Sequence, residues 1–239
     1  MFGIRDIFTL GRALVCSRSF RLALMLIVPY ACVLVGLDVA AHYGDATGAA
    51  LPVQFFMSQD HSFAEYLEYS LTIASAVLLF RLWLQSRTLM FLTNALLFVW
   101  ITLDNWVEIH EKLGFVLGAY IPGFDWMPVQ PHHLAETAVF GFVGLIWLAG
   151  MAVAFRKSDK TATGYGILIM LGIVGAAMFG VVVDLITSWG DHGIGVLNVL
   201  AFVEDEGEFA MTLLLFALSV AIHDRERDAM ALSKGTTAS

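Results

Sequence analysis

Six apolar runs of membrane length constrain this chain more than any other feature of its sequence. A helix needs about 20 predominantly apolar residues to cross the hydrocarbon core of a bilayer. Within that core only helices and closed barrels satisfy their own backbone hydrogen bonds. The sequence therefore predicts an all-α polytopic bundle of six transmembrane helices. The runs cover about residues 22–41, 63–85, 89–113, 133–155, 165–189 and 202–222.

The composition supports a membrane protein with the lipid bilayer as its partner. Hydrophobic residues make up 59% of the chain and charged residues 14%, whereas soluble domains are about 45–50% apolar and about a quarter charged. The two cysteines form no CxxC or haem-attachment motif, and there is no phosphate-binding loop, GxSxG or HExxH. Nucleic acid is not an expected partner, and the oligomeric state is left open.

The chain divides into three parts around the predicted bundle. Residues 1–21 place four arginines among apolar side chains, which is typical of an amphipathic helix on an anionic cytoplasmic surface. A cleaved signal peptide is the competing interpretation of this segment. The bundle itself covers residues 22–223, and residues 224–239 form a short charged tail.

Positive charges predict the orientation of the bundle. If six helices alternate across the membrane, all 13 Lys and Arg residues except Lys112 fall on one side. Because cytoplasmic loops carry an excess of Lys and Arg, both termini are expected in the cytoplasm. The predicted location is the inner (cytoplasmic) membrane of a bacterium.

Acidic residues and histidines gather on the opposite side. Five of the 21 acidic residues and one of the seven histidines, His223, are expected on the cytoplasmic side. Ionisable groups at membrane depth are costly, so their presence favours a functional interpretation. The expected metal ligands are Glu65, Glu68, Asp104, His110, Glu111, His133, Glu136, Glu204 and Glu208.

Helical spacing predicts how some of these groups point. At 100° per residue, Asp104, Glu108 and Glu111 fall within about 60° of one another on the third helix, and His110 points elsewhere. Asp184 continues a small-residue stripe and is expected to face a neighbouring helix. Glu108 and Asp184 are the expected catalytic residues. Other charges at this level are expected to be solvated or interfacial, namely Asp45, Asp60, His61, Asp125, His132, Asp191, His192, Asp205 and Glu206.

So many carboxylates at one level repel one another and are expensive to desolvate. Protonation, water or bound cations could compensate, and Lys112 is the one basic residue expected nearby. Carboxylate and imidazole ligands together suit Zn, Mn or Fe. Bundles that hold two metals use Glu and Glu-x-x-His motifs that project inward. This chain has the same types of residue but not the same motif. The expected cofactor is a divalent metal ion.

Short motifs add a resemblance to a known group of proteins. Leu103-Asp104-Asn105 followed by His110-Glu111 resembles the L-D-D-x4-H-E signature of uncharacterised bacterial multi-pass membrane proteins. Ser62-Phe63-Ala64-Glu65 and Glu204-Asp205-x-x-Glu208 are similar to the group's acidic openings of the second and last helices. The resemblance implies a shared site on these helices and no particular chemistry. Asn105 stands where the group more often has an acid.

Several functions are compatible with this pattern. The leading hypothesis is a metal-dependent membrane enzyme, either a hydrolase acting on a lipid-like substrate or an oxidoreductase of the two-iron type. The alternatives are a cation- or proton-coupled transporter and a non-catalytic sensor or complex subunit. A haem- or quinone-linked subunit is less favoured because the histidines lie at helix ends and not within the spans. Polar groups are sparse in the cytoplasmic halves of the helices, which favours a one-sided site over a transport path.

Overall fold

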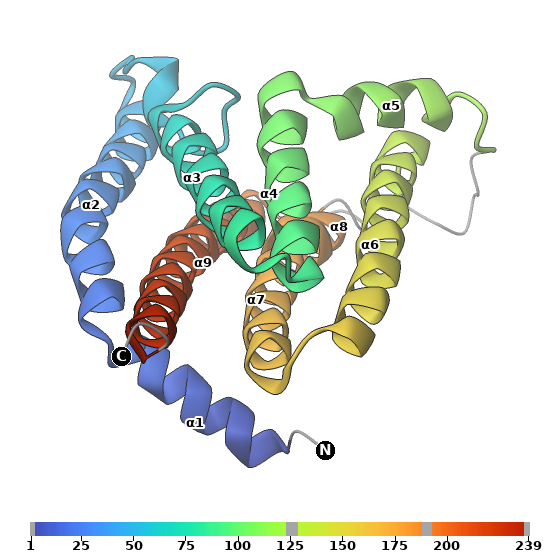
Figure 1. Ribbon diagram of the computed structural model, residues 1–239. Coiled ribbons are helices and arrows are strands. Elements are labelled where there is room, and N and C mark those ends of the chain that lie inside the picture. Colours follow the sequence, from blue (N-terminus) through green and yellow to red (C-terminus); the bar gives the residue numbers. More distant parts are fainter. Residues whose placement is uncertain (1–2, 123–128, 188–192, 237–239) are drawn as a thin grey trace.

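The computed structural model describes residues 3–122, 129–187 and 193–236, and all regular structure within these ranges is helical (Figure 1). The predicted all-α polytopic bundle is confirmed. Among the described residues, six helical spans are long and apolar enough to cross a membrane. The α-helices are α1 (Ile4–Val15), α2 (Arg18–Thr47), α3 (Phe63–Ser86), α4 (Leu89–Val107), α5 (Ile109–Gly118), α6 (Pro131–Lys157), α7 (Lys160–Ala177), α8 (Asp184–Thr187) and α9 (Ile194–Thr236).

Two short elements complete the chain path. The 3-10 helix η1 (Val53–Phe55) lies in the connection between α2 and α3. The π-helical segment η2 (Met178–Val183) joins α7 to α8, so that α7, η2 and α8 together form the fifth span. The first span begins at Arg18, earlier than the predicted residue 22, and α9 continues through most of the segment predicted to be a separate tail. α1 lies across one end of the bundle, against α7 and α9 (Figure 1).

α9 is the central helix, because it packs against α2, α3 and α7. The stripe of small residues on α7 and η2 makes the last of these contacts close. The stripe consists of Gly172, Ala176 and Gly180. A Cβ added at Gly172 would lie 2.5 Å from Leu215, and one at Gly180 would lie 2.3 Å from Oε2 of Glu208. Small residues let two membrane helices approach in this way. The prediction that the stripe faces a neighbouring helix is therefore confirmed for the part that precedes Asp184.

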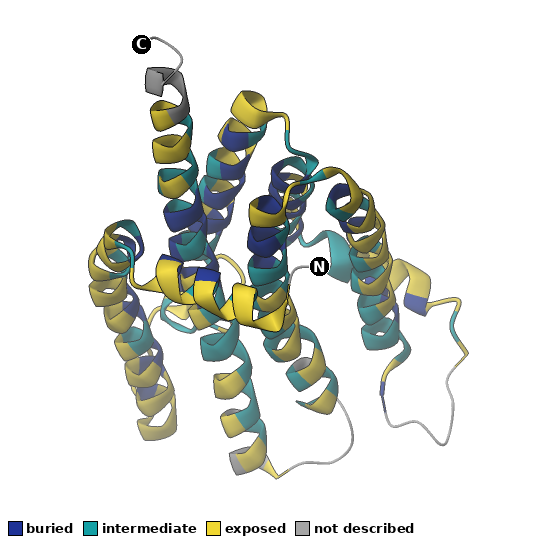
Figure 2. Cartoon of the chain, turned by 60° about the horizontal axis from the view of Figure 1, so that its bottom comes forward, coloured by how far each residue is buried: buried dark blue, intermediate teal, exposed yellow. Residues whose placement is uncertain are grey.

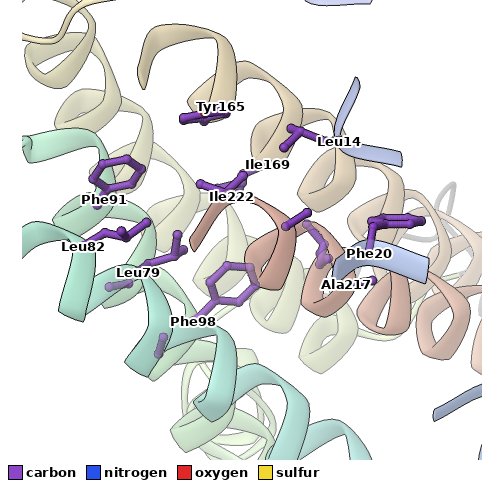
Figure 3. Close-up of a cluster of buried hydrophobic side chains, with 14 of the residues drawn as sticks. Leu14, Phe20, Leu79, Leu82, Phe91, Phe98, Tyr165, Ile169, Ala217 and Ile222 are labelled. Atoms are coloured by element: carbon purple, nitrogen blue, oxygen red, sulfur yellow. The ribbon is translucent and has the colours of Figure 1, made fainter. Parts of the chain in front are cut away.

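The half of the bundle nearest α1 is filled with apolar side chains. Leu82 of α3, Phe91 of α4, Tyr165 of α7 and Ile222 of α9 are essentially buried there, and Leu14 of α1 joins the same cluster (Figure 3). Exposed residues lie mainly on the outward faces of the helices, where a bilayer would contact them (Figure 2). The opposite half of the bundle is open, as described below.

The third span is shorter than predicted, and the expected continuous helix to residue 113 is wrong. α4 ends at Val107, and Glu108 adopts the left-handed conformation with φ of 54°. α5 then runs across the end of the bundle from α4 towards α6 (Figure 1). The cause is local: a carboxylate oxygen of Asp104 accepts the backbone N–H of His110 at 2.9 Å. Such side-chain acceptors compete with helix continuation.

α5 rests on the start of α6 through two glycines. A Cβ at Gly114 would lie 2.3 Å from Cγ of Glu136, and one at Gly118 would lie 2.7 Å from Cα of His132. The second contact is with backbone, which cannot move aside as a flexible side chain does. The absence of a side chain at Gly118 therefore fixes how closely α5 covers this end of the bundle.

Gly118→Ala is expected to destabilise the protein, because the added methyl group forces α5 away from α6. The expected loss is about 1–3 kcal/mol, typical of overpacking. Thermal unfolding in detergent, followed by circular dichroism, measures it. Val116→Ala is the control, since Val116 is 60% exposed on the same helix and should change stability by no more than about 0.5 kcal/mol. Equal unfolding temperatures for Gly118→Ala and the wild type would contradict the close contact.

Candidate functional site

A cavity of about 740 Å³ lies in the open half of the bundle, between α3, α4, α6, α7 and α9. Residues of α5 and of the connection before α3 line its outer end. All nine side chains predicted as metal ligands contribute to its wall, although they come from separate helices and from α5. They are Glu65, Glu68, Asp104, His110, Glu111, His133, Glu136, Glu204 and Glu208.

The two residues predicted to be catalytic are placed differently. Glu108 is not among the described residues that line the cavity. Its carboxylate lies 3.6 Å from Nζ of Lys112 and 3.7 Å from Nε2 of His61. The side chain of Asp184 lies outside the described residues. The predicted common face of Asp104, Glu108 and Glu111 is wrong, because the helix breaks at Glu108.

Asp104 and His110 form an enclosed pair of a carboxylate and an imidazole. The Asp104 side chain is 2% exposed, and its second carboxylate oxygen lies 3.0 Å from Nδ1 of His110. Both oxygens therefore engage His110, one through the ring and one through the backbone. Nε2 of the ring is on the other side, 3.8 Å from Glu111. The prediction that His110 points away from Asp104 is wrong, since the break at Glu108 folds the chain back.

The charges around α5 shift two pKa values. Burial lowers the pKa of His110, but the hydrogen bond to Asp104 and the charges of Asp104, Glu111 and Glu136 raise it by more, so that it lies above the ordinary 6.5. Burial and the charge of Asp60 raise the pKa of Glu111, and the charge of His110 opposes this only in part. His110 therefore retains its proton to higher pH than an exposed histidine, and Glu111 retains its proton to higher pH than an exposed Glu.

Three further donors meet at the first turns of α6. Ligand atoms of His132, His133 and Glu136 all lie within 4.8 Å of one another. Nδ1 of His133 is 3.2 Å from the Glu136 carboxylate, and the His132 ring stacks on Phe115 of α5. His132 lines the cavity, although the sequence analysis treated it as interfacial. Its spacing of four residues from Glu136 is the signal that could have identified it.

A second group of donors lies beside the outer end of the cavity and contains oxygen ligands only. Carboxylate oxygens of Asp60, Glu108 and Glu111 lie within 4.8 Å of one another. The segment before Asp60 is tied to α2 by the buried Asp38, which accepts the backbone N–H of Met57 at 2.8 Å. Asp60 is exposed, in agreement with the sequence analysis, and yet it also lines the cavity.

The wall formed by α3 and α9 is built around Glu68 and Glu208. Gly180 of η2 lies directly against Glu208, since a Cβ there would be 2.3 Å from its Oε2. π-Helical turns occur often at functional sites, and this one brings backbone to a carboxylate. Below Glu68, the hydroxyl groups of Thr72 and Thr102 are 2.8 Å apart. Thr72, Ser75 and Thr212 carry the polar lining further into the bundle.

No protein-family model, curated protein or solved structure matches this chain.

The pairing of Asp104 with His110 makes the stability of the protein depend on pH. Because the pKa of His110 is higher in the folded protein than in the unfolded chain, protonation of His110 stabilises the fold. This contribution is complete below the ordinary pKa of 6.5 and is lost as the pH rises through the pKa of the folded protein. Asp104→Asn should abolish most of this dependence and lower the pKa of His110. An NMR titration of the His110 ring in chelator-treated protein measures the pKa. Asp60→Asn is the control and should leave it near the wild-type value; an unchanged His110 pKa in Asp104→Asn would contradict the pairing.

Proposed function

We propose that this chain is a metal-dependent membrane enzyme that hydrolyses a lipid-like substrate at the outer end of the cavity. The observation that carries the proposal is the meeting of His132, His133 and Glu136 on the cavity wall. Imidazole and carboxylate together suit Zn, Mn or Fe. Following the distribution of positive charge, the site lies on the extracytoplasmic side of a bacterial inner membrane.

The three donors fit a single ion with little movement. Bonds from Zn to nitrogen or oxygen are about 2.1 Å long, so two donors of one ion lie at most about 4.2 Å apart. The present donor atoms lie within 4.8 Å of one another, and small rotations of the side chains would close the difference. Gly114 leaves room for Glu136, because any side chain at that position would meet it. A bound divalent ion would polarise a substrate carbonyl and acidify a water molecule.

His110 and Glu111 supply the proton transfers of the proposed hydrolysis. Asp104 accepts the Nδ1 proton, which leaves Nε2 of the neutral ring free to take a proton from the attacking water. Water adds to the carbonyl carbon, the bond to the leaving group breaks, and the leaving group takes the proton that Glu111 holds. The raised pKa of Glu111 supports this role. Asp104 is a positioning residue in this scheme.

The packed half of the bundle favours an enzyme over the alternative of a transporter. Leu79, Leu82 and Phe98 are essentially buried in the continuous apolar cluster below the cavity (Figure 3). A transport path needs polar groups or water through the full thickness of the membrane. The cavity thus resembles a one-sided reaction site, and a non-catalytic sensor remains the alternative if no turnover is found.

Metal binding is the first test. Purified protein is expected to contain about one Zn, Mn or Fe ion per chain by elemental analysis, and His133→Ala or Glu136→Gln should lose most of it after dialysis, because each removes one of three ligands. His42→Ala is the matched control, since His42 pairs with Asp38 away from the cavity. Protein that carries no stoichiometric metal, and takes none up after incubation with each ion, would rule out the proposal.

Turnover is the second test. Hydrolysis of long-chain amides and esters, followed by mass spectrometry of the released fatty acid, should stop with chelator and return with metal. His110→Gln and Glu111→Gln should each reduce the rate by about 10²–10⁴-fold while metal content is kept, as expected for general acid–base groups. Lys112→Gln, which alters an exposed neighbour of Glu108, should have little effect. Equal rates in all three variants would exclude the assigned roles.

A further inference from the structure

The inner part of the cavity is apolar on the side of α6 and α7, whereas hydroxyl groups of Thr72 and Ser75 lie on the side of α3 and carboxylates surround the outer end. Six uncharged side chains of α6, α7 and α9 form this apolar part. They are Val143, Trp147, Leu148, Met170, Leu171 and Leu215. One end of the same space is therefore suited to a polar group and the other to a hydrocarbon chain.

The apolar part also reaches the outer surface of the bundle. Leu148 of α6 and Leu171 of α7 both line the cavity, and yet they are 46% and 57% exposed. α6 packs on α4 and α5 but makes few contacts with α7. The neighbouring outward residues Leu145 and Ile146 are apolar and exposed, as expected for a surface in contact with lipid. The cavity thus opens sideways, between α6 and α7, towards the hydrocarbon of the bilayer.

The charges of the outer end restrict the head group of the occupant. Among the described residues that line the cavity, the ionisable groups are Asp, Glu and His, and none is Lys or Arg. Opposite charges attract and like charges repel most strongly where water is scarce. An anionic head group would find no basic side chain among these described lining residues, whereas a cationic amine would be attracted to every carboxylate that is ionised.

We propose that the cavity binds one long-chain amphiphile with a cationic or uncharged head group, which enters from the bilayer between α6 and α7. The tail lies along Trp147 and Leu215, and the head lies at Glu68 and Glu208. The cavity volume of about 740 Å³ is in the range of about 300–1,000 Å³ that holds one small ligand. This inference rests on the proposed function for the bond that is cleaved, while binding itself needs neither metal nor turnover.

Two glycines one turn apart on α6 provide a matched test. A side chain at Gly144 or at Gly141 would meet no atom within 4 Å of its Cβ, but only Gly144 lines the cavity. Gly144→Trp should fill the space for the tail, whereas Gly141→Trp adds the same side chain outside it. The probe is a long-chain amine with a diazirine near its end, added to full-length protein in lipid nanodiscs and mapped by peptide mass spectrometry after illumination.

The expected result is labelling of α6 and α7 residues inside the cavity, reduced about tenfold or more by Gly144→Trp and unchanged by Gly141→Trp. Excess unlabelled long-chain alcohol should abolish labelling of the wild type, which gives a test that depends on no variant. Labelling confined to outward residues such as Leu145 and Ile146, or equal in both variants, would overturn the inference.

The head-group part has its own test. In chelator-treated protein, the same diazirine chain ending in a carboxylate should label the cavity several-fold less than the amine, and equal labelling would overturn the charge argument. If the protein binds the amine but holds no metal, this inference stands and the proposed function is ruled out. If the protein holds metal but excludes both probes, the proposed function stands and this inference is ruled out.

Discussion

A carboxylate that is almost completely enclosed must find hydrogen-bond donors, and Asp104 finds both of its donors on His110. An unpaired buried charge would cost several kcal/mol, so the chain beyond α4 folds back to supply the backbone N–H and the ring Nδ1 of one residue. The left-handed turn at Glu108, the direction of α5 and the place of Glu111 all follow from that requirement. α5 in turn rests on α6 and brings Phe115 onto His132.

Much of the fold could be predicted from the sequence because the bilayer imposes simple rules on length and polarity. Six apolar runs predicted six spans, and acidic residues at helix ends predicted which side chains share one cavity, among them Glu65, Glu136 and Glu208. The break at Glu108 could not be predicted from periodicity, because it depends on a contact six residues along the chain. The same break explains why His110 was expected to point elsewhere, and why Glu108 was expected at the site.

The cavity combines two environments that proteins usually separate. Carboxylates and imidazoles surround its outer end, and apolar side chains of α6 and α7 line one side of the inner part. Gly172 of α7 and Gly180 of η2 allow the fifth span to touch α9 closely on one side, while the weak contact between α6 and α7 leaves the other side open. The asymmetry of helix packing therefore determines which face of the bundle has an opening.

The exposure of Leu148 and Leu171 has a kinetic consequence. A molecule that arrives between α6 and α7 diffuses in two dimensions within the membrane, whereas water arrives from the aqueous phase at the outer end. The quantity that sets occupancy is then the mole fraction of the amphiphile in the surrounding lipid and not its concentration in solution. Two preparations with equal total ligand but different amounts of lipid would therefore differ in occupancy, with the lipid-rich one less occupied.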